Sequence, residues 1–266
     1  MKSISASEEA SKEIDGTKQF RFAAGYRDLV RAMEAKFIAG GGQILFEHTV
    51  SRIEWKPKRV VVSARNADDT QRFEGQAVIV TLPLGVLQSG TVQFDPPLTD
   101  KEEGIRGLAM GNVMKLNLQL RDELWPEDKE GFIHLASEHF PTWWKHRDVV
   151  TAWAGGPKAE QLAKCSSMEI LDIAIKSLGT MFGVSDGEAR RFVASAQFHD
   201  WRKDPFTRGA YSYVPVGALE AQRAIARPVK RTLFFAGEAT AREGLQGTVH
   251  GAIESGIRAA REVLGA

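Results

Sequence analysis

The sequence predicts an α/β fold into which a smaller α+β region is inserted, and two patterns support this fold class. Segments with the twofold periodicity of strands alternate with segments of helical periodicity, and no long series of hairpins interrupts them. Residues 77–82 are apolar on both faces, which is typical of a buried strand in a mostly parallel sheet. Because such sheets bind ligands at the carboxyl ends of their strands, residues 81–85 are expected to form a loop at a binding edge.

The overall composition indicates an ordinary globular protein. The chain has 266 residues, of which 43% are apolar and 26% are charged, and its net charge is +1. That charge creates no field to gather nucleic acid or acidic lipid, no apolar run is long enough to span a bilayer, and residues 1–18 lack the apolar core of a signal peptide. The single cysteine, Cys165, excludes an internal disulfide. We therefore expect a cytoplasmic protein that binds neither nucleic acid nor membranes.

The N-terminal part is expected to form one helix followed by strands. Residues 26–38 predict an amphipathic helix with Leu29, Val30, Met33 and Phe37 on one face, and the glycines at 40–42 end it. This glycine run follows a helix and precedes a strand, which is the reverse of the order in a dinucleotide-binding loop. Strands are predicted at residues 43–46, 50–55 and 59–64, and a capping box at residues 99–102 predicts a helix that runs to about Met110.

The middle of the chain contains one strongly alternating strand, Val113–Leu120. Its even-numbered positions (Met114, Leu116, Leu118, Leu120) face one way, and its odd-numbered positions (Val113, Lys115, Asn117, Gln119) face the other. Tryptophans are frequent over the next segment, at 125, 143, 144 and 153. Further along, Ser167–Phe182 is predicted to be a helix, residues 192–198 a strand, residues 201–213 an irregular aromatic segment and residues 220–226 a helix, and residues 230–235 lead into the last part of the chain.

The last part of the chain combines an apolar run with a helix of unusual composition. The run 233–240 stops at Gly237 and Glu238, and after a polar loop Gly247 and Thr248 open a helical pattern. One face of that helix carries only small side chains: Thr248, Gly251, Ala252, Ser255, Gly256 and Ala259. Two interpretations are open, namely close packing of the helix on a sheet, or close approach of a ligand to a face and a helix start that favour an electron-rich group.

Several separated blocks of this sequence resemble the flavin-containing amine oxidases, the family of the monoamine oxidases, polyamine oxidases and lysine-specific histone demethylases. The blocks are residues 77–87, 94–98 and 110–116, Trp201 with Asp204 and Pro205, residues 209–213, and residues 234–260. They occur in the order of the family and extend from about residue 20 to the end. Each block alone is a modest signal, and their common order is what makes the resemblance specific.

The resemblance implies an FAD-dependent oxidation of an amine to an imine, which hydrolyses to an aldehyde and ammonia or an amine, while O2 is reduced to hydrogen peroxide. It also implies an FAD-binding Rossmann-like domain formed by residues 19–109 and 220–266, with a substrate domain at residues 110–219 inserted. The family's G-x-G-x-x-G unit, which holds the pyrophosphate and ADP half of FAD, does not occur in this sequence. The FAD-binding domain is therefore expected to be incomplete.

The residues that the resemblance implies for binding FAD are Val50, Thr81, Pro83, Trp201, Gly237, Glu238, Thr248, Val249 and Ala252. Gly237 and Glu238 match positions near the ribityl and pyrophosphate groups, and the backbone of Thr248 and Val249 matches positions at the pyrimidine edge of the flavin. The loop between Gly237 and Thr248 has one residue more than the commonest family pattern. Ala210 stands where the monoamine oxidases carry a cysteine bound to FAD, so the FAD is expected to be noncovalent.

The catalytic residues that the resemblance implies are Lys115 and Tyr211. Lys115 matches the lysine that reaches flavin N5 through a water, although by periodicity alone it is a lysine on the polar face of a strand. Tyr211 and Phe206 match aromatic positions along the substrate channel, where aromatic faces attract cationic amines. The other interpretation of these aromatics, and above all of Trp201, is that they are core residues.

Two functions remain open from the sequence. The chain is either part of an amine oxidase that acts on a small-molecule amine, or a non-catalytic subunit or truncated remnant that needs an N-terminal partner chain. The apolar segments 77–82 and 234–235 predict association with such a partner or with a second copy. No metal site is expected, because the histidines are too widely spaced for a ligand set.

Overall fold

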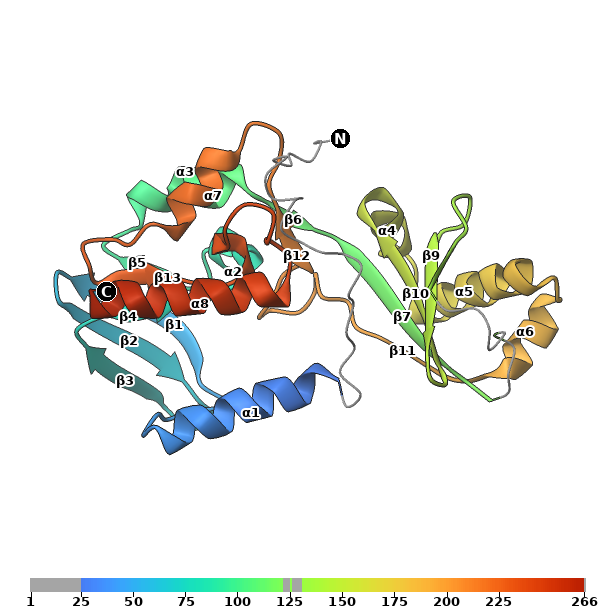
Figure 1. Cartoon of the computed structure of the whole chain (residues 1–266), viewed down its shortest axis with the longest axis horizontal. Helices are drawn as coiled ribbons and strands as arrows, with labels where there is room; N and C mark the ends of the chain where they lie inside the picture. The colour runs from blue at the N-terminus through green and yellow to red at the C-terminus, as the bar shows by residue number, and fades with distance from the viewer. Residues whose placement is uncertain (1–24, 122–124, 126–130, 266) are drawn as a thin grey trace. The chain divides into compact units, whose positions relative to one another are not determined.

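A computed structural model describes residues 25–121, 125 and 131–265 of the chain. These residues form two compact units (Figure 1). The first unit contains the described residues up to Leu82, the segment Leu87–Leu108 and the residues from Val214 onward. The second unit contains Pro83–Val86 and Ala109–Tyr213. Within the described residues, no helix is both long enough and apolar enough to cross a bilayer.

The larger sheet of the first unit has four strands in the order β3-β2-β1-β5. They are β1 (Thr49–Lys56), β2 (Arg59–Arg65), β3 (Thr70–Gly75) and β5 (Gln93–Asp95). β1 and β2 form an antiparallel hairpin, and Ile53, Val60 and Val61 are buried there. β3 was not expected from the sequence, because an edge strand this polar lacks the alternation of a half-buried strand.

The second sheet of this unit is a parallel pair of β4 (Val78–Val80) and β13 (Leu233–Phe235). Helix α8 (Val249–Leu264) packs on it through Ala259, which clusters with Phe234 and Ala236 (Figure 1). The predicted parallel strand is thus confirmed, but its burial on both faces is wrong, since Ile79 is 37% exposed.

Helix α1 (Tyr26–Ala39) forms where the pattern predicted it and ends at Gly40, whose N–H bonds back to the last turn. None of its residues is buried, and its apolar face is exposed at Tyr26, Val30, Met33 and Phe37. The strand predicted at residues 43–46 is wrong. Ile44, Leu45 and Phe46 are consecutive rather than alternating, and Phe46 is 70% exposed.

Helices α3 (Thr99–Gly107) and α7 (Leu219–Ala226) lie against each other. Gly104 allows their approach, because a Cβ there would lie 3.0 Å from the carbonyl oxygen of Ala221. The predicted capping box is wrong: Thr99 is already helical, Leu98 occupies the N-cap and no side chain caps the helix. The helix also ends before Met110, because residues 109–111 pair as strand β6 (Ala109–Gly111).

Lys101 is the most deeply buried cation of the described residues, with 2% of its surface exposed. Its ammonium donates to the carbonyl oxygens of Ala224, Ile225 and Arg227 at the end of α7, where a positive charge is favourable. It also lies 4.6 Å from the ring centroid of Phe235. Burial, together with the charges of Arg227 and Arg258, lowers the pKa of Lys101 from 10.5 to about 8.

Stability is expected to rise with pH through the range in which Lys101 loses its proton. Below pH 8 the amine is charged in the folded and the unfolded chain, so the cost of burying the charge is fully present. Between about pH 8 and 10.5 the folded state has released the proton while the unfolded state still holds it. The free energy of unfolding should therefore increase by about 3 kcal/mol across this window. Urea unfolding as a function of pH measures this, and Lys101→Met should remove the increase.

The second unit is built on a five-stranded antiparallel sheet in the order β11-β7-β10-β9-β8. Its strands are β7 (Val113–Leu120), β8 (Phe132–His134), β9 (Thr142–His146), β10 (Val149–Gly155) and β11 (Val193–Phe198). The alternation expected for β7 is confirmed, since Met114, Leu116, Leu118 and Leu120 are buried.

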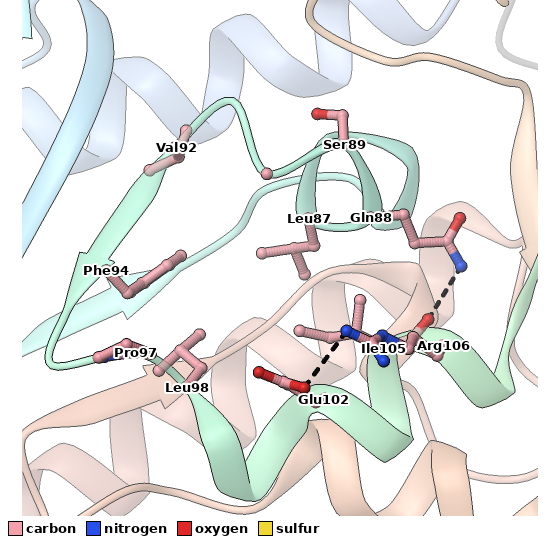
Figure 2. Close-up of a pocket in the computed structure, with 11 residues that line it drawn as sticks. Leu87, Gln88, Ser89, Val92, Phe94, Pro97, Leu98, Glu102, Ile105 and Arg106 are labelled. Atoms are coloured by element: carbon pink, nitrogen blue, oxygen red, sulfur yellow. Dashed lines mark hydrogen bonds and ion pairs between the residues drawn. The ribbon is translucent and has the colours of Figure 1, made fainter.

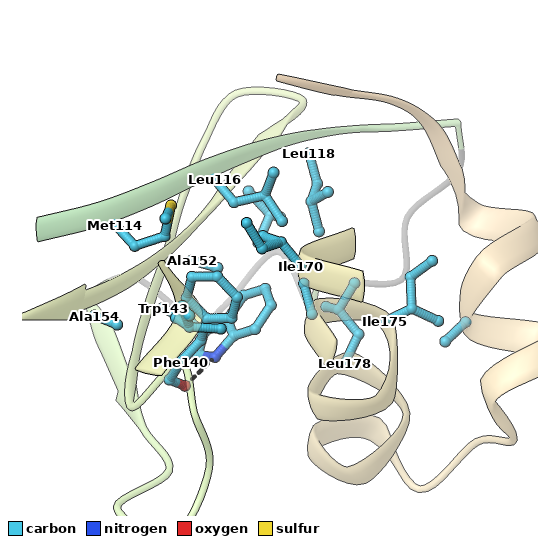
Figure 3. Close-up of a cluster of buried hydrophobic side chains, with 14 of the residues drawn as sticks. Met114, Leu116, Leu118, Phe140, Trp143, Ala152, Ala154, Ile170, Ile175 and Leu178 are labelled. Atoms are coloured by element: carbon cyan, nitrogen blue, oxygen red, sulfur yellow. Dashed lines mark hydrogen bonds between the residues drawn. The ribbon is translucent and has the colours of Figure 1, made fainter. Parts of the chain in front are cut away.

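One face of this sheet is covered by helices α4 (Gly156–Leu162), α5 (Ser167–Phe182) and α6 (Asp186–Phe192). Figure 3 shows the resulting core, in which Trp143 and the even-numbered side chains of β7 meet Ile170 and Leu178 of α5. The predicted bounds of α5 are confirmed. Ser166 and Glu169 form a capping box at its start, and Gly183 ends it with a φ of 67°.

Candidate functional site

The chain turns sharply at Gly237, directly after strand β13. Gly237 has a φ of 116°, a conformation that only glycine adopts without strain. The short helix η1 (Glu238–Thr240) follows, and both the N–H and the hydroxyl of Thr240 donate to the carbonyl oxygen of Gly237 at 3.0 Å. On the other side of the turn, the hydroxyl of Ser255 on α8 accepts the N–H of Gly237 at 2.9 Å. We call residues 235–240 the Gly237 turn.

The start of α8 lies next to the loop that follows this turn. Thr248 is the N-cap, and its hydroxyl accepts the N–H of Gly251 and donates to the carbonyl oxygen of Leu245. Only glycine fits at Gly251, because a Cβ would lie 2.2 Å from the carbonyl oxygen of Leu245. Glu238 closes the loop, since its carboxylate accepts the N–H of Gly247 at 2.7 Å.

The small-residue face of α8 is packed closely over part of its length. Gly251, Ser255 and Ala259 are buried and account for close packing. Ala252 and Gly256 are only partly buried, and no atom lies within 4 Å of a Cβ placed on Gly256. Part of the face is therefore free to receive another group.

Among the residues expected to bind FAD, those of the Gly237 turn and of the start of α8 lie together. Thr81 joins them, because its carbonyl oxygen lies 4.0 Å from the position of a Cβ on Gly237. Both residues follow the carboxyl ends of the parallel strands β4 and β13, as the sheet-edge argument expected. Val50 lies on β1 in the other sheet, where it is paired with Ala64 of β2.

Lys115 lies on the face of the second unit's sheet opposite the core that the even-numbered side chains of β7 enter. Its Nζ lies 5.7 Å from the ring centroid of Trp144 on β9, and in the strand register Lys115 is opposite Trp153 on β10. Thr151 and Asn117 lie on the same face and bond to each other at 2.9 Å. The polar face expected for β7 thus places a lysine beside aromatic rings, with Lys115 as the cation of a cation–π contact to Trp144.

Trp201 and Phe206 lie on a loop that is stabilised by hydrogen bonds between its own residues. The carbonyl oxygen of Trp201 accepts the N–H of Gly209 at 2.9 Å and the hydroxyl of Thr207 at 2.8 Å. The carboxylate of Asp204 accepts the N–H of Phe206 and lies 2.9 Å from Nε2 of His199. These two interactions lower the pKa of Asp204.

The aromatic side chains of this loop are not core residues. Trp201 is 42% exposed and Phe206 is 62% exposed, so the core interpretation of Trp201 is wrong. The ring of His199 meets Trp201 edge-on at 4.4 Å between centroids. Residues 199–211 therefore present aromatic faces to the surroundings rather than filling the interior.

Tyr211 opens strand β12 (Tyr211–Tyr213), which pairs with β6. Gly111 is opposite Tyr211, and a Cβ on it would lie 3.1 Å from the Tyr211 carbonyl oxygen. Burial raises the pKa of Tyr211 above its ordinary value, so its phenol is neutral at physiological pH.

Pro83 lies where helix α2 (Leu84–Ser89) begins, so the loop predicted at residues 81–85 ends sooner than expected. Its carbonyl oxygen accepts the N–H of Val86 at 3.0 Å. The helix start lies against the aromatic loop, because a Cβ on Gly85 would lie 2.6 Å from the carbonyl oxygen of Arg208. The structure thus brings Pro83 to the loop that carries Trp201 and Phe206.

Sequence reasoning missed three residues of these sites. Ser255 was assigned only to a small-residue face, and Trp144 only to a tryptophan-rich segment. Gln246, directly before the start of α8, has a buried side-chain oxygen that receives no hydrogen bond from any described residue. No group of His, Cys, Asp and Glu side chains in the described ranges is arranged to hold a metal ion.

The first unit also contains a cavity away from these residues, with a volume of about 530 Å³. Figure 2 shows its wall, in which Leu87, Val92 and Phe94 face Leu98 and Ile105 of the α3 region, and Glu102 and Arg106 pair at 3.3 Å. None of the residues expected to bind FAD or amine lines it.

Comparison with known proteins defines the class to which this fold and these residues belong. The family described as flavin containing amine oxidoreductase matches residues 6–264. The chain therefore belongs to this family, and the resemblance of its sequence blocks is confirmed.

Its relatives include a lysine-specific histone demethylase and a polyamine oxidase. The chain is 34% identical over 227 residues to lysine-specific histone demethylase 1 homolog 3 of Arabidopsis thaliana, covering 81% of this chain and 14% of that protein. It is 29% identical over 248 residues to polyamine oxidase 2 of the same plant, covering 90% of this chain and 47% of that protein.

The fold resembles putrescine oxidase. The structure of that enzyme bound to putrescine matches with a TM-score of 0.76 at 24% identity, covering 91% of this chain and 53% of that chain. This likeness confirms the mixed α/β architecture. The chain spans about half the length of this structure and of polyamine oxidase 2, and a smaller share of the demethylase.

Proposed function

We propose that this chain supplies flavin-facing and amine-facing residues of an FAD-dependent amine oxidase. The observation that carries the proposal is the surface made by the Gly237 turn and the start of α8, where Gly237, Thr248 and Ala252 are only partly buried and Val249 is exposed next to a helix N-terminus. The first unit would then be part of an FAD-binding domain, and the second unit its substrate domain. Membership of the flavin-containing family supports this assignment.

The described residues fit a flavin at this surface. A helix start favours an electron-rich edge, which the pyrimidine ring of the flavin provides. The unpaired oxygen of Gln246 requires a hydrogen-bond donor, and the same edge carries one at N3. Thr248, Val249 and Ala252 would hold this part of the cofactor noncovalently, Gly237 and Glu238 would lie near its ribityl and pyrophosphate groups, and Thr81 would lie beside it.

The flavin, when bound, supplies the electron acceptor for an amine C–H bond and passes the electrons to O2. The residues of the second unit would orient the reactants. Lys115 would hold a water beside the flavin, and Tyr211, Phe206 and Trp201 would present aromatic faces to the amine. A neutral phenol at Tyr211 suits this role, because it adds no charge that repels or traps a cationic substrate.

The substrate class we propose is a small primary or secondary amine, with polyamines or monoamines favoured over amino acids. Polyamine oxidase 2 and putrescine oxidase are relatives by sequence and by fold, respectively.

The visible absorption spectrum of the purified chain, followed by peroxide release from putrescine, spermidine, benzylamine and a methylated lysine peptide, tests the proposal. A chain that remains colourless and inactive under all conditions, including after addition of an N-terminal partner, contradicts it.

Lys115→Met is expected to lower the rate of amine oxidation about 100-fold, because one oriented donor beside the reacting centre is lost. The FAD affinity should stay unchanged, since Lys115 is not in the group around Gly237. Stopped-flow reduction and reoxidation of the flavin measure the effect. Lys176→Met, which removes an exposed lysine of α5, is the matched control. Equal rates in the two variants would show that Lys115 has no part in the chemistry.

A second candidate function is that of a subunit that acts only with an N-terminal partner chain. The observation that favours it is the exposed apolar face of α1. We expect the purified chain to associate through this face, and Phe37→Glu to shift it toward a monomer, whereas Arg31→Glu should not. Light scattering over a range of concentrations measures this. A soluble wild-type monomer at high concentration argues against a docking role for α1.

A further inference from the structure

The side chain of Arg258 joins three segments of the first unit. It lies on α8, and its Nη2 donates to the carbonyl oxygen of Phe235 at 2.7 Å and to the hydroxyl of Thr240 at 3.2 Å. Its Nη1 donates to the carbonyl oxygen of Ala226, at the end of α7, at 3.1 Å and pairs with Glu262 at 3.0 Å. One guanidinium therefore connects α8, α7 and the Gly237 turn.

The two turn contacts of Arg258 lie on either side of Gly237. Phe235 is the last residue of β13 before the turn, and Thr240 is the last residue of η1 after it. The hydroxyl of Thr240 in turn donates to the carbonyl oxygen of Gly237. Arg258 is thus linked to Gly237 through the hydroxyl of Thr240. Its hydrogen bonds to Phe235 and Thr240 fix the backbone before and after the glycine.

The side chain at position 258 must satisfy acceptors in several directions. Its partners are two backbone carbonyls, one hydroxyl and one carboxylate. A guanidinium offers five N–H donors in a planar fork, whereas an ammonium offers three at a single point. Ser255, three residues earlier on the same helix face, supports the turn from the other side.

We propose that Arg258 is a positioning residue for the cofactor. It sets the backbone of the Gly237 turn, and it acts on FAD only through that turn, without a contact of its own. The effect of Arg258 on FAD rests on the proposed function, because that function defines where the flavin binds. The ordering of the turn is inferred from the hydrogen bonds of Arg258 alone.

The first experiment measures hydrogen exchange of the full chain without FAD. In Arg258→Ala the amides of residues 236–241 should exchange about tenfold faster than in the wild type, since charge-assisted hydrogen bonds are lost. Millimolar guanidinium chloride should restore the wild-type rates, and sodium chloride at equal ionic strength should not. Arg261→Ala, which removes an exposed arginine of the same helix, should change nothing. Unchanged exchange in Arg258→Ala, or acceleration spread evenly over the first unit, overturns the proposal.

The second experiment measures FAD affinity by quenching of flavin fluorescence in the same variants. The dissociation constant should rise about tenfold in Arg258→Ala and recover with guanidinium. If the turn loosens while the FAD affinity stays unchanged, the inference that Arg258 acts on the cofactor is wrong. If the wild type binds no FAD, the proposed function fails for this chain, and the exchange experiment still decides whether Arg258 orders the turn.

Discussion

Gly251→Ala is expected to destabilise the first unit by about 3 kcal/mol. The added Cβ would lie 2.2 Å from the carbonyl oxygen of Leu245 and 3.0 Å from the Cβ of Ala241. Both neighbours belong to the loop that leads into α8, so the loop or the helix has to move. The shift would also separate Thr248 from Leu245, and thereby disturb the helix cap at the proposed flavin edge.

The matched control is Gly256→Ala, on the same helix. No atom lies within 4 Å of its Cβ, so the change should stabilise the helix by about 0.5–1 kcal/mol through higher helix propensity. Urea unfolding, followed by hydrogen exchange of α8, measures both variants. Stability changes of the same sign at the two positions would show that close backbone approach does not determine the requirement for glycine at 251.

Trp143→Ala is expected to cost the second unit about 4 kcal/mol of unfolding free energy. Trp143 is fully buried between the sheet and α5 (Figure 3), and its indole N–H donates to the carbonyl oxygen of Phe140 at 2.8 Å. The substitution leaves a cavity and an unpaired carbonyl together. Circular dichroism during urea unfolding gives the difference in stability.

The neighbouring Trp144 provides the control, because it points to the opposite face of the same strand. Trp144→Ala should cost less than about 1 kcal/mol. It should nonetheless alter amine oxidation, since it removes the ring beside the amine of Lys115. A large loss of stability in Trp144→Ala would indicate that this face of the sheet is also packed.

Elements whose pattern depends only on their own residues could be predicted from the sequence. The bounds of β7 and α5 follow from strict alternation and from Ser166, Glu169 and Gly183 at the helix ends. Elements that depend on a neighbour could not. β3 is a strand only because β2 pairs with it, and residues 44–46 are apolar but find no partner among the described strands.

The candidate site shows the same division. Gly237, Glu238 and Thr248 belong to one short motif, and the structure brings them together. Trp144 and Arg258 could not be assigned, since their roles depend on strand register and on contacts between distant segments. The burial of Ile79 was overestimated because an apolar side chain does not reveal whether another element covers it.

The order in which the segments occur along the chain also bears on biosynthesis. The second unit is nearly continuous, because Ala109–Tyr213 supplies all of it except four residues. The first unit is not, since β4 pairs with β13, and α7 and α8 come later than the whole second unit. The ribosome therefore completes the five-stranded sheet of the second unit while the first unit still lacks β13, α7 and α8. During translation, the apolar side of β4 must stay soluble until the final segment has emerged.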